Sequence, residues 1–79
     1  MHYLATFFTH SGAVKYRRYM RKLGIEAELL PVPRRLSSDC GIAAQFSTSQ
    51  DPAGLITEDI HKLFVVEEGG ERVLYSADG

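Results

Sequence analysis

Cys40 is the residue whose chemistry stands out, because it is the single cysteine among 79 residues. A cysteine thiolate is a nucleophile and a sulfur acceptor, and neighbouring guanidinium groups or a helix N-terminus favour it over the thiol. Arg34 and Arg35 come shortly before Cys40, in a segment that Pro31 and Pro33 hold extended. The pattern indicates a reactive cysteine beside arginine; a small buried cysteine and a solvated arginine pair are the open alternatives.

A second polar group, Thr9-His10-Ser11-Gly12, follows an aromatic run and precedes a helical pattern. Thr9 or Ser11 is suited to cap that helix. The first backbone N–H groups of the helix, at Ser11 and Gly12, are expected to bind an anion together with Arg35. His10 is able to add positive charge or to act as a base toward the cysteine, and a loop or capping role is its alternative.

Three segments have the residue pattern of β-strands: residues 2–8, 25–30 and 40–46. Between the first two, apolar residues recur at helical spacing as far as Gly24, which predicts a helix that Gly24 terminates. Pro52 predicts the start of a second helix. The apolar stripe expected for that second helix consists of Leu55, Ile56, Ile60, Leu63 and Phe64.

Val65 and Val66 begin a final strand, which residues 68–71 turn into a hairpin with residues 72–75. The order β-α-β-β-α-β predicts an α+β, ferredoxin-like fold, an antiparallel sheet with two helices on one face and a C-terminal hairpin. The chain is then one domain, residues 1–79, of which residues 76–79 fray. In this topology the third strand lies between the first and the second, so the Thr9–Gly12 turn, the 31–39 loop and Cys40 converge at one rim.

The charges are unevenly distributed along the chain. Residues 1–35 hold seven cations and two acids, a net charge of +5, whereas residues 36–79 hold two cations and eight acids, a net charge of −6. Five of the cations lie within the predicted first helix, and three of them, Lys15, Arg18 and Lys22, face away from its apolar stripe. This asymmetry favours an acidic partner on the basic side, and a solvated helix face is the plainer alternative.

Several classes of protein are excluded or disfavoured. One cysteine excludes a disulfide-stapled scaffold, a multi-thiolate zinc site and an iron–sulfur cluster within one chain. His2, His10 and His61 lack the spacing of metal ligands on one element, and no cofactor is expected. Nucleic-acid binding is disfavoured because Glu26 and Glu28 of the second strand would repel phosphate. Neither a membrane span nor a secretory signal is recognisable, which predicts a cytoplasmic protein.

The motif Pro31-x-Pro33-Arg34, followed by Ser37-x-x-Cys40-Gly41, resembles the selenium/sulfur carrier protein-like family. The resemblance covers about residues 3–66 and leaves the acidic hairpin and tail, residues 67–79, outside. It implies a cytosolic prokaryotic protein in which Cys40 is the candidate chalcogen acceptor, with Arg34 beside it. It further implies a carrier or accessory protein rather than an enzyme, with a protein partner in sulfur or selenium transfer.

Two functions therefore remain open. A carrier needs one cysteine, because the thiol that attacks the bound chalcogen belongs to the next protein. The alternative is a non-enzymatic interaction module, a homodimer or a subunit, in which Cys40 is structural. Alternation predicts Tyr3 and Phe7 on the open face of the sheet, where Ala5, Gly41 and Ala43 would leave a smooth apolar surface for such a contact.

Overall fold

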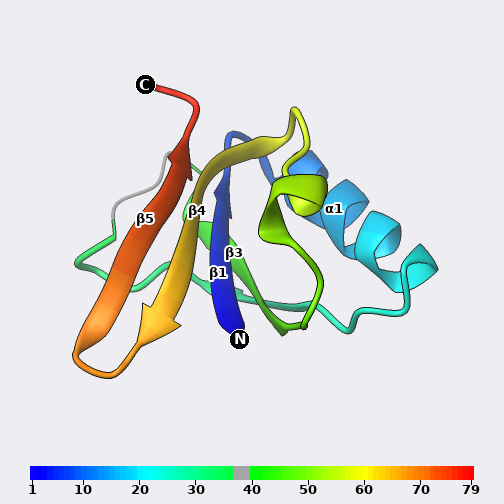
Figure 1. Cartoon of the computed structure of the whole chain (residues 1–79). Coiled ribbons are helices and arrows are strands. Elements are labelled where there is room, and N and C mark those ends of the chain that lie inside the picture. The colour runs from blue at the N-terminus through cyan, green and yellow to red at the C-terminus, as the bar shows by residue number, and fades with distance from the viewer. Residues whose placement is uncertain (37–39) are drawn as a thin grey trace.

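The computed structural model describes residues 1–36 and 40–79. Its elements, in chain order, are β1 (His2–Phe7), α1 (His10–Lys22), β2 (Glu28–Pro31), β3 (Ile42–Ser47), the 3₁₀ turn η1 (Pro52–Leu55), β4 (Ile60–Glu67) and β5 (Gly70–Ser76). In this described part of the chain, one α-helix lies across one face of a single five-stranded sheet (Figure 1). No helix in it is long and apolar enough to cross a membrane.

The sheet is antiparallel throughout, in the order β2-β3-β1-β4-β5. Ala43 pairs with Thr6 of β1, and Ile42 pairs with Pro31 of β2. The expected position of the third strand between the first and the second is confirmed, and so is the C-terminal hairpin. The end of β1, the end of β2 and the start of β3 therefore share one rim of the sheet.

The predicted second helix is wrong, and with it the ferredoxin-like fold. Asp51 caps only the single turn of η1, and the residues that follow form β4 between β1 and β5. A β-bulge explains the error, because the register with β1 shifts so that Thr6 faces Lys62 while Phe7 faces Ile60. The extra residue turns Ile60 and Leu63 to the same face at a spacing of three, which imitates a helical stripe.

Local signals account for both ends of α1. The Thr9 hydroxyl accepts a hydrogen bond from the Gly12 N–H at 2.9 Å, the N-cap expected from the sequence. At the other end Gly24 has a φ of +78°, and the N–H groups of Gly24 and Ile25 bond back to the carbonyls of Arg21 and Met20. This is a Schellman motif, and the predicted termination at Gly24 is confirmed.

The sheet buries apolar residues on both faces. On the α1 side, Tyr3 and Phe7 pack with Tyr16 and Met20 of the helix. The opposite face carries Leu4, Ala43 and Phe64, which we call the loop-side cluster. The expectation that Tyr3, Ala5 and Phe7 line an open face is wrong, because the alternation of β1 turns them toward the helix.

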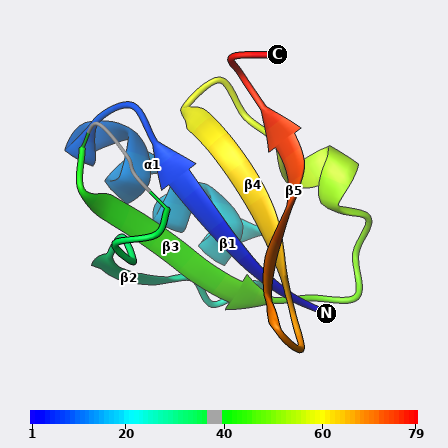
Figure 2. The same cartoon turned by 90° about the vertical axis from the view of Figure 1, so that its left-hand side faces the viewer.

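The loop-side cluster is covered by residues 31–36, which we call the arginine segment. Val32 and Leu36 are half-buried against the cluster, together with Leu30 and Val66. The segment lies on the side of the sheet opposite α1 (Figure 1), and in Figure 2 it passes in front of the strands. The arginine segment, which beyond Pro31 has no regular secondary structure, thus covers the face of the sheet opposite α1. In many α+β folds a helix covers a sheet face in this way.

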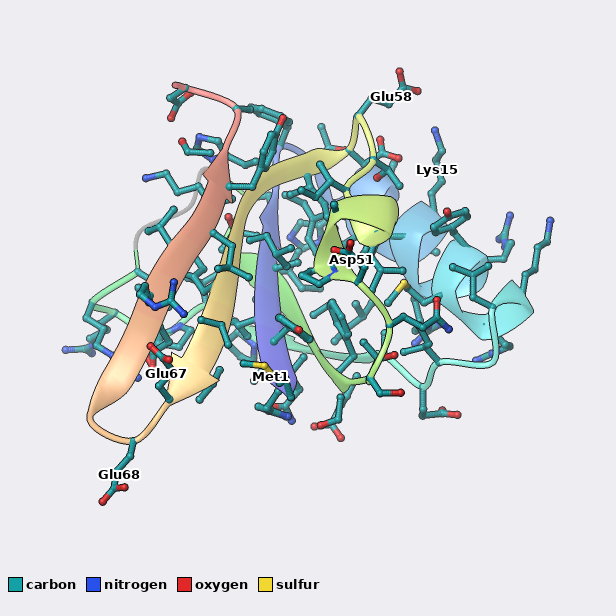
Figure 3. All side chains as sticks on the ribbon, in the orientation of Figure 1. Met1, Lys15, Asp51, Glu58, Glu67 and Glu68 are labelled. Atoms are coloured by element: carbon teal, nitrogen blue, oxygen red, sulfur yellow. The ribbon has the colours of Figure 1, made fainter. Side chains whose placement is uncertain are left out.

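The C-terminus returns to the sheet. The Ala77 N–H donates to the carbonyl of His61 at 2.8 Å, and the side chain of Asp78 lies 2.7 Å from His61 Nε2. The hairpin tip extends to the other end of the sheet, where Glu68 points away from the body of the protein (Figure 3). The last strand is therefore an integral part of the sheet, and one of its residues contacts the arginine segment.

Candidate functional site around Cys40

The rim brings His10 and Cys40 together, although 30 residues separate them. His10 is the first residue of α1, and its Nε2 lies 2.8 Å from the carbonyl oxygen of Cys40. Because a carbonyl only accepts hydrogen bonds, Nε2 carries the proton and donates it. His10 therefore holds the backbone of Cys40, while its Nδ1 is the nitrogen left for any acid–base role.

The Cys40 side chain is half-buried and packs against the apolar cluster on the α1 side. Its thiol donates a hydrogen bond to the carbonyl of Ile42 at 3.5 Å. Gly41 has a φ of +72°, so the chain turns sharply between the cysteine and β3 at a residue without a Cβ. The thiol thus lies two residues before β3, between the core and the surface.

The start of α1 already has a carboxylate beside it. A Cβ added to Gly12 would come within 3.2 Å of Asp59 Cβ and 3.3 Å of Asp59 Oδ1. Asp59 also pairs with Lys15 at 3.7 Å, and the Gly12 N–H is already bonded to Thr9. A helix N-terminus favours a negative charge, and Asp59 supplies one. Anion binding at Ser11 and Gly12 stays a prediction, with this competitor next to it.

The two arginines have different surroundings. Arg34 is exposed and takes part in no ion pair within residues 1–36 and 40–79. Arg35 forms a two-point ion pair with Glu71 of β5, in which Nε donates to Oε1 at 2.8 Å and Nη2 donates to Oε2. The hydrogen bond from Arg35 lowers the pKa of Glu71, and the same bond raises the pKa of Arg35. The guanidinium expected to bind an anion is thus engaged with a carboxylate of the chain itself.

Sequence reasoning missed both acidic partners. Asp59 falls where the second helix was predicted, and Glu71 falls in the hairpin turn. Arg35 and Glu71 are 36 residues apart, so no spacing rule connects them. Ser37 and Asp39 of the predicted motif lie outside the described residues. Within the described part of the chain, no group of three metal-binding side chains and no pocket is found.

The fold and the rim define a small antiparallel β protein with one helix, whose cysteine follows a proline- and arginine-containing segment. A family described as "Putative Se/S carrier protein-like" has a model that matches residues 2–58. The chain belongs to this family. The matched range contains the whole rim and ends before β4 begins, so the last two strands lie outside it. Neither the comparison with curated proteins nor the comparison with solved structures finds a match.

Proposed function

We propose that this protein carries sulfur or selenium on Cys40, or assists a protein that does, in the cytoplasm of a prokaryote. The observation that carries the proposal is the position of Cys40 within the family-matched region, tied by its carbonyl to His10 at 2.8 Å. In the transfer step, the Cys40 thiolate attacks the terminal sulfur of a persulfide on a donor protein. A new S–S bond forms on Cys40, the donor's S–S bond breaks, and the donor cysteine leaves as a thiolate.

We infer the roles of the neighbouring residues from their surroundings. His10 positions the cysteine backbone through its donated hydrogen bond. Arg34 is the exposed cation of the segment that Glu71 does not engage, and it is the one we assign to the negative charge of the loaded sulfur or selenium. Ser11, Gly12 and Arg35 remain secondary candidates for that charge, because Asp59 and Glu71 already lie against them.

We assign the docking of a protein partner to the basic face of α1. Arg17, Arg18, Arg21 and Lys22 are all exposed and form no ion pair within the described residues. Like charges three and four residues apart destabilise an isolated helix, so such a cluster is costly unless an acidic surface compensates for it. Arg18 lies about 12 Å along the helix from His10 at the rim. An acidic donor or acceptor protein that docks on α1 would thus reach Cys40.

The test is direct loading of the thiol. The protein is incubated with a cysteine desulfurase or a selenocysteine lyase and its amino-acid substrate, and the intact mass is then measured without reductant. We expect the mass of one added chalcogen atom, absent from Cys40→Ala and from protein alkylated beforehand. An unmodified Cys40, or a modification that survives Cys40→Ala, would contradict the proposal.

A second candidate, an interaction module that forms a homodimer, is favoured by the exposed edge of β5. Val73 and Leu74 are 53% and 38% exposed on this edge strand, and β5 contains no proline. Edge-to-edge pairing of two copies would place each of these residues beside side chains of the partner strand. Light scattering over a dilution series separates the candidates. A dimer that persists on dilution, combined with an inert Cys40, would favour the module over the carrier.

A further inference from the structure

An ion pair joins the arginine segment, within the family-matched region, to β5, which lies outside that region. Arg35 and Glu71 meet from opposite halves of the chain, and both oxygens of the carboxylate accept hydrogen bonds from the guanidinium. The Glu71 side chain is only 7% exposed, whereas that of Arg35 is 66% exposed. The Glu71 side chain is therefore largely buried, whereas the Arg35 side chain that binds it lies at the surface. A two-point pair of this kind restrains orientation as well as distance.

The ion pair holds the far end of the arginine segment. At its near end, the Val32 N–H donates to the carbonyl of Gly41 at 3.1 Å. In between, the Leu36 N–H bonds to the carbonyl of Pro33 at 2.9 Å and closes a turn. Because the segment belongs to no strand beyond Pro31, these bonds and the contacts of Val32 and Leu36 with the loop-side cluster are the interactions among the described residues that hold it against the sheet.

This network ends next to the cysteine. Gly41, which accepts the bond from Val32, follows Cys40 directly in the chain. The carbonyl of Cys40 itself accepts from His10. A displacement of the arginine segment therefore acts on the Gly41 carbonyl, one residue after the cysteine, through the bond from Val32.

We propose that Glu71 is a positioning residue for Cys40 that acts through Arg35. Its carboxylate holds the arginine segment on the loop-side cluster and thereby, through the bond from Val32 to Gly41, restrains the local opening of the backbone that would expose Cys40. The biological use of this restraint rests on the carrier function proposed above. An acidic partner protein that takes Arg35 from Glu71 would release the segment, so docking and exposure of the thiol would be coupled.

The hairpin offers a matched control for testing Glu71. Glu67 forms a similar ion pair with Arg72, at 2.9 Å between Oε1 and Nε, but it does not contact the arginine segment. Glu67→Gln therefore removes a second arginine-paired carboxylate, a more exposed one, from the same hairpin (Figure 3). The probe is iodoacetamide, a neutral alkylating reagent, used on the full chain at fixed pH. Each variant is first shown by circular dichroism to be folded.

Glu71→Gln is expected to raise the alkylation rate of Cys40 by about threefold or more, because local opening of a surface segment costs little free energy. Glu67→Gln should leave the rate close to that of the wild type. Arg35→Gln should match Glu71→Gln, and the double variant should show no further increase, since both remove the same interaction. Equal rates for Glu71→Gln and Glu67→Gln, or additive effects of Arg35→Gln and Glu71→Gln, would overturn the proposal.

Hydrogen exchange distinguishes positioning from general destabilisation. In Glu71→Gln the amides of Val32 and Leu36 should exchange faster, while the amides in the middle of α1 keep their protection. Faster exchange throughout α1 would show a loss of global stability instead and would refute a positioning role. Neither measurement involves a chalcogen. Failure of Cys40 to load would therefore contradict the carrier function but not the positioning role of Glu71. Failure of the alkylation or exchange test would contradict the positioning role but not the carrier function.

Discussion

Removal of the His10 side chain tests the organisation of the rim most directly. His10→Ala deletes the hydrogen bond to the Cys40 carbonyl, and the bond from Val32 to Gly41 and the pairing of Pro31 with Ile42 remain. A neutral hydrogen bond contributes about 1 kcal/mol net. The equilibrium for local opening at Cys40 should therefore shift by about fivefold toward the open form, since 1.4 kcal/mol corresponds to a factor of ten.

The global effect of the same variant should be small. His10 is exposed and lies outside both apolar clusters. An upper limit of about 1 kcal/mol would lower the melting temperature by about 4–8 °C in a domain of this size. The expected result is thus a clear change in Cys40 alkylation with a modest change in thermal stability. His10→Gln is the matched control, because its side-chain amide is able to donate to the same carbonyl.

Alkylation of Cys40 with iodoacetamide, followed by intact-mass spectrometry, measures the opening. His10→Ala should react about five times faster than the wild type if the bond contributes as estimated. His10→Gln should remain near the wild-type rate. Unchanged reactivity in His10→Ala would show that the hydrogen bond does not restrain the cysteine. An equal increase in both variants would show that the imidazole acts in some way other than as a donor.

Three further predictions concern the core and the partner face. Burial, with Tyr19 adding to it, raises the pKa of Tyr16, so the folded state binds this proton more tightly than the unfolded state does. Urea unfolding should then show stability falling above about pH 10, by at most about 1.4 kcal/mol per pH unit, a component absent from Tyr16→Phe. Phe64→Ala should cost about 3 kcal/mol in the same assay, because Phe64 is buried, whereas Val73→Ala, at its exposed cross-strand partner, should cost less than about 0.5 kcal/mol. Arg18→Glu should slow chalcogen loading by a donor enzyme about tenfold at low salt, with Lys62→Glu as control, and equal rates for the two variants would contradict docking on α1.

The parts of the fold that were predictable carry their signals locally. Thr9 and Gly24 bound α1 through interactions within a few residues, and alternation located β1, β2 and β3. Once three strands and one helix are placed, antiparallel pairing leaves few arrangements, and the rim with Cys40 and His10 follows from it. The convergence of these two residues was accordingly predictable, although the bond to the carbonyl rather than to the thiol was not.

The second helix was predicted wrongly because the spacing of buried residues in β4 fits both a helix and a bulged strand. The bulge beside Lys62 changes the spacing of buried residues in β4, and the resulting pattern fits a helix as well as a strand. Only pairing with β1 on one side and β5 on the other decides between them. The same misassignment hid Asp59, whose position beside the start of α1 depends on how β4 enters the sheet.

The sequence by itself determined the candidate residue Cys40, its proline and arginine neighbours and the family, because these depend on residue types and short spacings. The tertiary structure alone decided which arginine is engaged, which carboxylate engages it, and what covers the second face of the sheet. Arg35 meets Glu71 across 36 residues because the arginine segment is drawn onto the loop-side cluster by apolar burial. Apolar burial has no preferred direction, and the surface that the segment covers exists only once all five strands are paired. No local sequence pattern therefore predicts the contact between Arg35 and Glu71.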